Sequence, residues 1–529
     1  KPQTTEKIAT GGLFQIITNV GKQDELIFAD SLLQSRIAES KAKRAAMIKA
    51  GNDNISPYPS LNEIEQTHIL FTNIKCKPFV KMSMEYSRTP KSSVTLDSQI
   101  EFDIPQFGDF FSDMVVNVVF DTVTASATGT AADASDVALC RYCDYPGERL
   151  FRKVQFTVNN APLDEYYQEV YPMHRQLRVS ADKLAGWRRA TGQSAASSAV
   201  AEYLSTTSST AAPLGNQLEM KVLNGYQTYK TLQPRLSLNI PLLFWFCDIR
   251  QAVPSAAIPF GQRKITIDLE AQSNMIRAIV NPSATTALTS PTVTPLSIVT
   301  CDLYINNIFV DQTVQDIFIN RIGFSLTRVH RRQLINLTKS TDQQQLTSLK
   351  WPTETIYVGF QPVANTTTNS NTTARGSQAS VIDANMEDWH RFGVVITTSA
   401  PTSALNGAAA GYVVKSEAAH VTTIGIQSYG IDLFREMPGS FFNSYIPYQY
   451  GGSNIVTPTD PGIYMINFAA YPGSYQPSGH INISRSREFF IKYQSSYIAS
   501  NAAVNMFVNA TSINFLFVSE GSAIMRFTT

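Results

Sequence analysis

Charged side chains are scarce in this sequence. Asp, Glu, Lys and Arg make up 16% of its 529 residues, well below the roughly 25% of an average soluble protein. The 43 basic and 42 acidic residues nearly cancel, so the chain lacks the strong positive field that draws proteins to nucleic acid. We therefore expect no sequence-specific nucleic-acid partner. A near-neutral surface fits a protein that packs against copies of itself, and it fits a glycan-binding β-sandwich equally well.

Cysteine is scarce as well. The chain has five, and only Cys140 and Cys143 are close in sequence. A small, odd and scattered set argues against a disulfide framework and for a reducing compartment. Cys140-x-x-Cys143 is half of a zinc-binding pattern, but no second pair is present to complete it. Two half-buried thiols at the end of a strand are the simpler interpretation, and no metal or cofactor is expected.

Long hydrophobic runs are missing. The first residues, KPQTTEKIATGGLF, lack the apolar core of a signal peptide. The longest strongly apolar runs, such as Ile240 to Cys247, are far shorter than the ~20 residues that cross a bilayer. We expect a soluble chain, or one that meets a membrane only through partners.

The common catalytic motifs are also missing. The sequence contains no GxxxxGK[ST], GxGxxG, GxSxG or HExxH motif and no EF-hand loop. The best enzymatic candidate is Asp388-Trp389-His390, because Asp388 and His390 would share one face of a strand and could hydrogen-bond. A structural pair explains such a triplet more simply, so we expect no catalytic residues and no enzyme.

Short strands account for most of the sequence after Leu61. Ile265, Ile267 and Leu269 alternate with polar residues in Lys264 to Glu270, which is typical of a half-buried strand. An apolar strand is expected in Leu236 to Cys247, interrupted by Pro241. A turn is expected at Asn159-Asn160, after Val154 to Val158. Near the end of the sequence, Ile513 to Val518 and Ala523 to Phe527 are expected to form a hairpin. Many short strands with Gly and Pro turns predict an all-β protein built from antiparallel sandwiches.

One segment has the pattern of a long helix. From Asp24 to Ala50 the residues are strong helix formers with apolar residues at helical spacing, and Gly51 is placed to end the helix. The second half is basic, with Lys41, Lys43, Arg44 and Lys49. These residues are either a solvated helix face or part of an N-terminal arm that touches an anionic surface or another subunit.

Five long Ser/Thr/Ala/Asn-rich stretches separate the strands, at Thr124–Val137, Ser194–Pro213, Pro282–Pro295, Ala364–Ser380 and Ser399–Ala419. Loops longer than ~15 residues are unusual in compact domains, and such residues cannot fill a core, so we expect them at a rim. Their presence in both halves predicts two sandwiches. The expected organisation is an N-terminal arm over 1–56, a first sandwich over 57–320 and a second over 321–529.

Aromatic residues cluster in the C-terminal half. Phe441-Phe442-Asn443-Ser444-Tyr445 and Tyr448-Gln449-Tyr450 have the side chains that stack on sugars. More often such residues fill a sandwich core or a subunit contact. Both interpretations remain open at this point.

The segment Gln476 to Arg485, QPSGHINISR, has the most distinctive pattern. Pro477, Ser478 and Gly479 suit a turn, and Ile481 and Ile483 then alternate with Asn482 and Ser484 as in a strand. The string resembles a signature of the major capsid proteins of nucleocytoplasmic large DNA viruses. The resemblance rests on Gln476, Pro477, Ser478, Gly479, Asn482, Ser484 and Arg485.

Further blocks in the same order resemble the branch of this family found in African swine fever virus and the faustoviruses. They are Gly21–Asp24, Leu32–Ile37, Pro105–Phe111, Tyr145–Leu150, Ile258–Gly261, Leu303–Asn307, Asp388–Gly393, Ser444–Pro447 and Ser512–Leu516. The chain departs from the swine fever protein where that protein carries long insertions, at Thr124–Val137 and 194–235.

The resemblance implies a double jelly roll, two tandem eight-stranded antiparallel sandwiches, preceded here by a helical arm. It also implies a homotrimeric, pseudo-hexameric capsomer that tiles the icosahedral shell of a large double-stranded DNA virus. The expected partners are neighbouring capsomers, minor capsid or penton proteins and, through the arm, an internal membrane. The expected location is the virion shell, assembled in the host cytoplasm. The alternative from the residues alone is a carbohydrate-binding or carbohydrate-cleaving sandwich.

Overall fold

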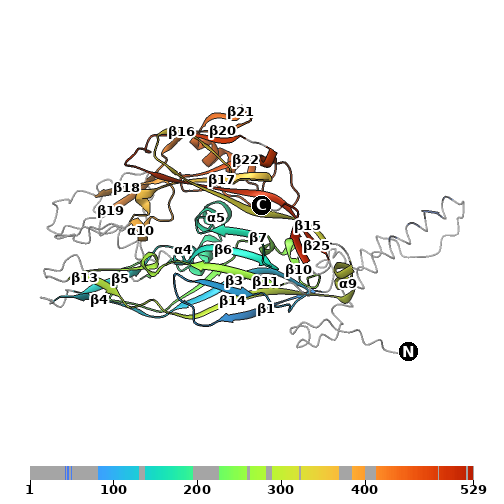
Figure 1. Cartoon of the computed structure of the whole chain (residues 1–529), viewed down its shortest axis with the longest axis horizontal. Helices are drawn as coiled ribbons and strands as arrows, with labels where there is room; N and C mark the ends of the chain where they lie inside the picture. The colour runs from blue at the N-terminus through green and yellow to red at the C-terminus, as the bar shows by residue number, and fades with distance from the viewer. Residues whose placement is uncertain are drawn as a thin grey trace.

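Two β-lobes lie one above the other in the computed structural model (Figure 1). The structure describes ten continuous stretches and five single positions of the arm. They are residues 82–129, 137–194, 225–258, 262–280, 289–320, 323–367, 384–399, 413–485, 488–519 and 522–527, with residues 38, 42, 45, 46 and 49.

The first lobe is a sandwich of two antiparallel sheets. One sheet has the order β1-β14-β3, with β9 and β10 both on the free edge of β3, and the other has the order β2-β11-β6-β7. The strands are β1 (Met82–Lys91), β2 (Gln99–Asp103), β3 (Phe110–Phe120), β6 (Phe151–Val158), β7 (Ala161–Tyr167), β9 (Leu236–Pro241), β10 (Val253–Pro254), β11 (Arg263–Leu269) and β14 (Ile298–Val310).

The second lobe is built in the same way. One sheet has the order β15-β25-β17-β22, with β23 added to β17 and β26 to β25, and the other has the order β16-β24-β20-β21. The strands are β15 (Gly323–Leu337), β16 (Thr341–Gln345), β17 (Pro352–Pro362), β20 (Val421–Ser428), β21 (Ile431–Pro438), β22 (Ile463–Asn467), β23 (Ile481–Asn482), β24 (Phe489–Ser495), β25 (Val504–Ser519) and β26 (Ser522–Met525).

The two lobes share one topology. If the eight main strands of each lobe are counted along the chain, one sheet has the order first, eighth, third, sixth, and the other has the order second, seventh, fourth, fifth. Both lobes follow this order, which is that of a jelly roll. The predicted double jelly roll is therefore confirmed.

The strands form where the sequence alternates. In β11, Ile265, Ile267 and Leu269 are fully buried in the first core, while the residues between them are partly exposed. Burial of each such side chain stabilises the fold by roughly 1.5–3 kcal/mol. The second lobe has its own core, in which Ile424 and Ile426 of β20 face Ile491 and Tyr493 of β24.

Turn chemistry sets several strand ends. Asn159 and Asn160 have φ values of 51° and 63° and join β6 to β7, as predicted, because Asn tolerates the left-handed region. Pro241 ends β9, since proline donates no hydrogen bond to a ladder. The predicted continuation of the strand is wrong: the strand does not extend past Pro241, and Trp245–Cys247 form a 3₁₀ turn. The predicted C-terminal hairpin is present as β25 and β26.

Helices are short and lie in the connections. None that the structure describes is long and apolar enough to cross a membrane. The α-helices are α4 (Pro146–Leu150), α5 (Val170–Arg178), α6 (Leu184–Ala190), α8 (Gln272–Met275), α9 (Gln312–Asn320), α10 (Ala384–Glu387) and α11 (Ile446–Tyr450). The tighter or wider turns are η1 (Trp245–Cys247), η2 (Ile249–Gln251), η3 (Val363–Asn365), η5 (Ile483–Arg485) and the π-helical η4 (Phe441–Tyr445).

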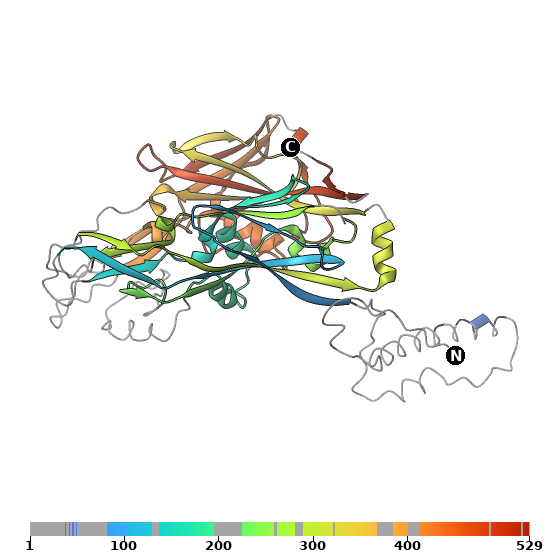
Figure 2. The ribbon, with the colours of Figure 1, turned by 60° about the horizontal axis from the view of Figure 1, so that its bottom comes forward.

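The prediction of long loops is wrong in part. Segments expected as loops contain strands that pair with each other at one end of the molecule, opposite α9 (Figures 1 and 2). They are β4 (Val123–Thr128), β13 (Thr289–Val293) and β19 (Val413–Ala418); β4 pairs with β13 and with β8 (Leu232–Gln233), and β19 pairs with β18 (Val394–Ser399). In the same region β5 (Ala138–Tyr142) pairs with β12 (Ile276–Val280). Most of the remaining predicted loop residues lie outside the described stretches.

The predicted arm helix can be compared with the structure at five positions only. Ala38, Ala42, Ala45, Ala46 and Lys49 are helical and exposed; the rest of 1–56 lies outside the described residues. The predicted domain boundary at 320/321 falls between the end of α9 and the start of β15, and it stays a prediction.

Candidate structural sites: the signature segment and the seam between the lobes

The signature segment lies in the connection between β22 and β24 of the second lobe. The backbone N–H of Tyr471 donates to the Ser478 hydroxyl at 2.6 Å, and the Ser474 hydroxyl donates to the Gln476 carbonyl at 2.6 Å. Gly479 has φ 149°, and a Cβ there would lie 2.9 Å from the Phe468 carbonyl oxygen. Glycine is therefore required at this position, because the backbone has a positive φ and passes close to the Phe468 carbonyl.

The second half of the segment ties this connection to β17. β23 pairs with Pro352 and Thr353 at the start of β17. Ile483 is buried in the second core and its N–H donates to the Trp351 carbonyl, while the Ser484 hydroxyl accepts from the Trp351 N–H at 2.6 Å.

The strand predicted over Ile481 to Ile483 is wrong beyond Asn482. The ladder ends at the pair Pro352–Asn482. The next residue toward the N-terminus of β17, Trp351, has φ 77° and is not extended, so Ile483 finds no strand to pair with. Ile483 instead begins the 3₁₀ turn η5, which also contains Ser484 and Arg485. The structure thus brings Ser484 to β17 and Ser478 to Tyr471. That the seven signature residues have a structural role remains a prediction.

A second site is the seam where the lobes meet, and helix α5 is its centre. Met173 and Leu177 of this first-lobe helix are buried against the second lobe, in one cluster with its core residues. The Leu177 carbonyl accepts from the Val456 N–H at 2.8 Å, and the Gln176 side chain accepts from the Thr459 N–H at 3.0 Å. Figure 1 shows α5 between the two lobes.

Buried ion pairs cross the seam. Arg141 of β5 pairs with Glu387 of α10 at 2.7 Å, and both side chains are almost fully buried. Burial alone would lower the pKa of Arg141, but the carboxylates of Asp144 and Glu387 raise it above its usual value. Arg332 of β15 pairs with Glu169. Burial raises the pKa of the Glu169 carboxyl, and Arg332 opposes that shift.

The Asp388-Trp389-His390 triplet belongs to this seam. It follows α10 in a turn, so the prediction of a strand with Asp388 and His390 on one face is wrong. The Trp389 indole N–H donates to the Asp144 carbonyl at 2.7 Å, and Asp388 pairs with Arg391 at 3.2 Å. The His390 ring packs against the Tyr145 ring, with centroids 4.8 Å apart and ring planes at 44°. Trp389 and His390 therefore contact residues of the first lobe, whereas Asp388 pairs within its own turn.

The cysteine pair lies at the end of β5. Cys140 and Cys143 are both free and fully buried, so the prediction of half-buried thiols is wrong. Burial raises the pKa of each thiol to about 11. Both thiols therefore stay protonated at neutral pH. Within the described stretches, no group of three or more His, Cys, Asp or Glu side chains is arranged to hold a metal ion.

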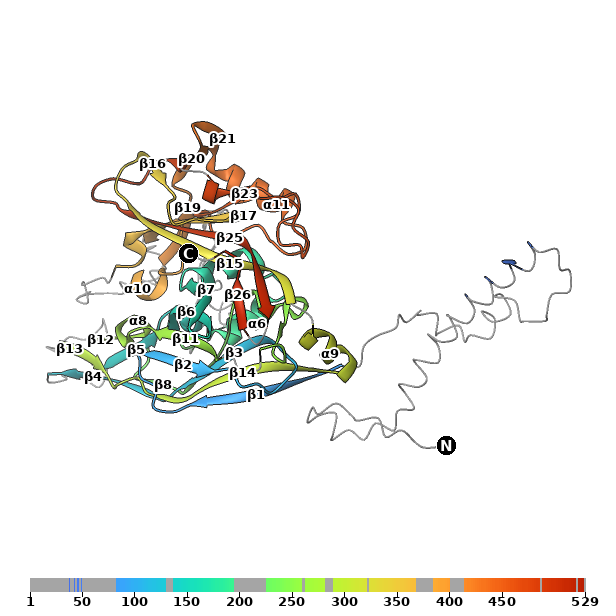
Figure 3. The same ribbon diagram turned by 45° about the vertical axis from the view of Figure 1, so that its right-hand side comes forward.

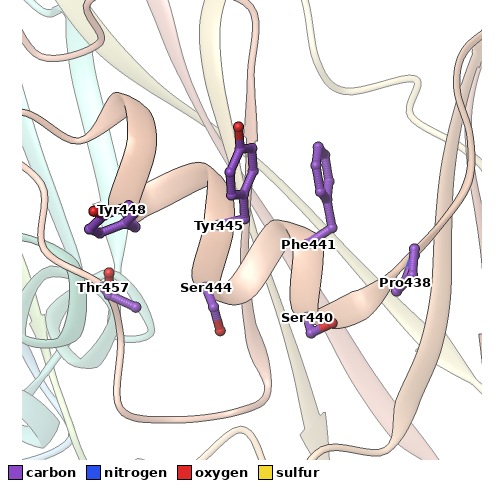
Figure 4. A pocket seen from close by; sticks show the side chains of 7 residues that line it. All are labelled: Pro438, Ser440, Phe441, Ser444, Tyr445, Tyr448 and Thr457. Atoms are coloured by element: carbon purple, nitrogen blue, oxygen red, sulfur yellow. The ribbon is translucent and has the colours of Figure 1, made fainter.

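The aromatic cluster divides between the core and the surface. Phe442 is fully buried, whereas Tyr445 is 48% and Tyr448 is 78% exposed. Phe441 and Tyr445 stack with ring centroids 5.3 Å apart, and both rings project from the same side of the helical turn (Figure 4). The cluster lines an open groove of about 810 Å³ bounded by Pro438, Ser440, Phe441, Ser444, Tyr445, Tyr448 and Thr457.

The seam could not be predicted from the sequence. Its residues are far apart in the chain, and the one available signal was a charged residue inside a strand-like, otherwise apolar segment, such as Arg141 in Ala138–Tyr142. A charge at such a position is rarely buried without a partner, but the sequence does not name the partner.

Two family models match the chain. The model described as "Major capsid protein N-terminus" matches residues 74–311, and the model described as "Large eukaryotic DNA virus major capsid protein" matches residues 308–524. The major capsid protein of African swine fever virus (isolate Pig/Kenya/KEN-50/1950) is 30% identical, over 99% of this chain and 100% of the relative. The hexon protein p72 of the Badajoz 1971 Vero-adapted strain has the same identity and coverage.

Solved structures give the same picture. The faustovirus major capsid protein superposes with a TM-score of 0.67 at 32% sequence identity, over 96% of this chain and 100% of that chain. A subunit of the PBCV-1 virus capsid superposes with a TM-score of 0.58 over 87% of this chain and 100% of that chain. Its identity is 18%, so this second likeness concerns the fold alone.

Proposed function

Since the chain belongs to the major capsid protein family of large eukaryotic DNA viruses, we propose that three copies form a pseudo-hexameric capsomer that tiles an icosahedral shell. The protein is a structural component of the virion shell, in which it assembles with copies of itself, and it is not an enzyme. Family membership favours this function over the carbohydrate-binding sandwich.

The observation that carries the proposal is the shared topology of the two lobes. Three chains supply six lobes of one design, and six similar units around an axis give the hexagonal outline that tiling requires. The contact between copies is then heterologous and closes into a ring after three steps. An obligate interface of this kind buries more than ~2,000 Å² per pair.

Light scattering coupled to size-exclusion chromatography tests the homotrimer. We expect one species at three times the 58.4 kDa chain mass, still present after dilution because the interface is obligate. A stably folded monomer at neutral pH would count against the proposal.

We also propose an orientation for the subunit. The Ser/Thr/Ala-rich segments, especially Ser194–Pro213 and Ala364–Ser380, form the outer crown, because they are weakly charged and cannot build a core. The end with β4, β13, β18 and β19 would then face outward. Met82, the first residue of β1, pairs with Val310 at the opposite end, next to α9, and the arm would lie on the inner face of the shell.

The arm gives the proposed inner partners. Lys41, Lys43, Arg44 and Lys49 would meet an internal membrane or a minor capsid or penton protein, with each near-surface charge worth ~1 kcal/mol against anionic lipid. Changing all four to Gln should leave the trimer intact and weaken particle assembly or binding to anionic vesicles. Normal assembly together with normal vesicle binding would refute this role. Assembly in the host cytoplasm fits the reduced, buried thiols of Cys140 and Cys143.

A further inference from the structure

The helical turns that form the seam have a counterpart at the same position of the second lobe. In each lobe the connection from the fifth to the sixth main strand carries helical turns. In the first lobe this connection follows β7 and contains α5; in the second it follows β21 and contains η4 and α11. The two sets of helical turns are therefore topological equivalents.

Helix α5 packs on a specific surface, the outer face of the β15-β25-β17 sheet of the second lobe. The Asn509 amide of β25 donates to the Met173 sulfur at 3.4 Å, and Arg178 donates to the Tyr357 hydroxyl of β17 at 3.2 Å. Gly359 of β17 leaves room for this contact, since a Cβ there would lie 2.6 Å from the Met173 methyl group. Strand β7 adds a contact to β15, where Asp164 accepts from the His330 N–H at 2.9 Å.

The equivalent surface of the second lobe is uncovered in the single chain. Tyr445 is 48%, Tyr448 78% and Tyr450 39% exposed on η4 and α11, and Ile431 is 68% and Leu433 41% exposed on the adjacent edge strand β21. In Figure 3 this strand lies on the side of the second lobe away from the first. A patch of exposed aromatic and aliphatic side chains is typical of a protein contact. Leaving it in water is unfavourable, because its apolar area stays hydrated. We call this the β21–α11 surface.

The sheet of the first lobe that corresponds to β15-β25-β17 is also uncovered in the single chain. The outer face of β1-β14-β3 lies on the side of the first lobe away from the second (Figure 1). Met82, Met84 and Tyr86 of edge strand β1 are 43%, 41% and 58% exposed there. Asn306 lies on this face of the eighth strand β14, as Asn509 does on the eighth strand β25, and donates to Asp113 at 2.8 Å. We call this the β1–β14 face.

We propose that the β21–α11 surface of one copy packs on the β1–β14 face of the next copy, repeating between chains the contact that α5 and β7 make within each chain. The inference rests on the proposed homotrimer. Each copy then offers one donor and one acceptor surface that differ from each other, so the contact is heterologous. Three internal seams and three seams between copies alternate around the ring and close it.

Single substitutions on both surfaces test the inference in the full-length chain. Tyr448→Glu and Met84→Glu each place a charge in the proposed contact, and both side chains are exposed in the single chain, so neither change should alter its fold. We expect each variant to raise the dissociation constant of the trimer at least tenfold by light scattering. Ile396→Glu, at a 48% exposed residue of β18 outside both surfaces, is the matched control and should remain trimeric.

Cross-linking supplies a readout that does not depend on dissociation. Chains that carry one cysteine at Tyr445 or Tyr448 and one at Met84 or Tyr86 should form covalent trimers on mild oxidation, whereas chains with either cysteine alone should not. The inference would be overturned, and the homotrimer left standing, if Tyr448→Glu and Met84→Glu both stay trimeric and the double-cysteine chains form no cross-links. Binding of oligosaccharide or another protein in the groove of an unchanged trimer would also overturn it. A monomeric wild-type chain would instead overturn the proposed function.

Discussion

Single residues hold the seam through charges that have been removed from water. Arg141 and Glu387 are 2% and 1% exposed and lie 2.7 Å apart. A buried pair of this kind adds little net stability compared with apolar residues of the same volume, but either partner alone is costly. The pair therefore fixes how the lobes meet more than it strengthens the fold.

We expect Glu387→Ala to destabilise the protein by at most roughly 3–5 kcal/mol, because the buried Arg141 guanidinium loses one of its two carboxylate partners and keeps the other, Asp144. The double variant Arg141→Met/Glu387→Leu should lose less than the sum of its two single variants, because the second change removes a carboxylate that the first leaves buried without its cation. Asp144, which also pairs with Arg141, stays in place in every variant. Urea unfolding of Arg141→Met, Glu387→Leu and the double variant measures the coupling. Additive losses would contradict the account.

His174 of α5 should make the seam sensitive to acid. Burial, with smaller contributions from Arg178 and His330, lowers the pKa of His174 from 6.5 to about 3. Between these values the unfolded chain binds a proton that the folded chain does not, so protonation favours unfolding. Stability is complete above pH 6.5 and falls as the pH drops below it.

Between pH 7 and pH 5 the wild type should lose roughly 1–2 kcal/mol more unfolding free energy than His174→Gln. Burial raises the pKa of Glu148 and Glu169, and these carboxyls act in the opposite direction, but they are common to both proteins and cancel in the comparison. Thermal unfolding at a series of pH values gives the difference. Identical pH dependence in the two proteins would contradict it.

Gly479 should tolerate no side chain. Its φ of 149° and the 2.9 Å approach of the Phe468 oxygen predict that Gly479→Ala costs roughly 1–3 kcal/mol. Gly186→Ala in α6 is the control, because a Cβ there meets no atom within 4 Å and alanine favours a helix. Equal melting temperatures for the two variants would contradict the tight turn.

At the scale of elements, local patterns predicted most of the framework. Alternation predicted β11 and Asn159-Asn160 predicted the β6–β7 turn, whereas the strand predicted to continue past Pro241 ends there. The Ser/Thr/Ala-rich strands β4 and β13 were missed, because their composition alone does not reveal that each finds a pairing partner. The seam was missed for the same reason: Arg141 and Glu387 are 246 positions apart.

The crown segments should be dispensable for folding. Asn365 at the base of one segment is anchored by hydrogen bonds to the Arg391 and Gly393 carbonyls, and this anchor precedes Thr366. Deleting Thr366–Thr373 should therefore leave trimer mass unchanged and the melting temperature within a few degrees of wild type. A variant that fails to fold would show that the segment contributes to a core.

At the scale of the whole molecule, low charge and repeated topology act together. Two lobes with the same strand order meet through one seam within the chain, and each presents an apolar surface on its side away from that seam. A near-neutral chain avoids the long-range repulsion that would oppose close packing of many copies. The proposed ring joins copies of the molecule through these two unlike faces.

The central claim, a closed ring of six lobes, is tested most directly by electron cryo-microscopy of the purified full-length protein. We predict a threefold particle in which β21, η4 and α11 of each copy lie on the β1-β14-β3 sheet of the next, with six similar seams around the axis. A twofold dimer, an isolated chain, or a threefold particle in which both surfaces face solvent would contradict the account.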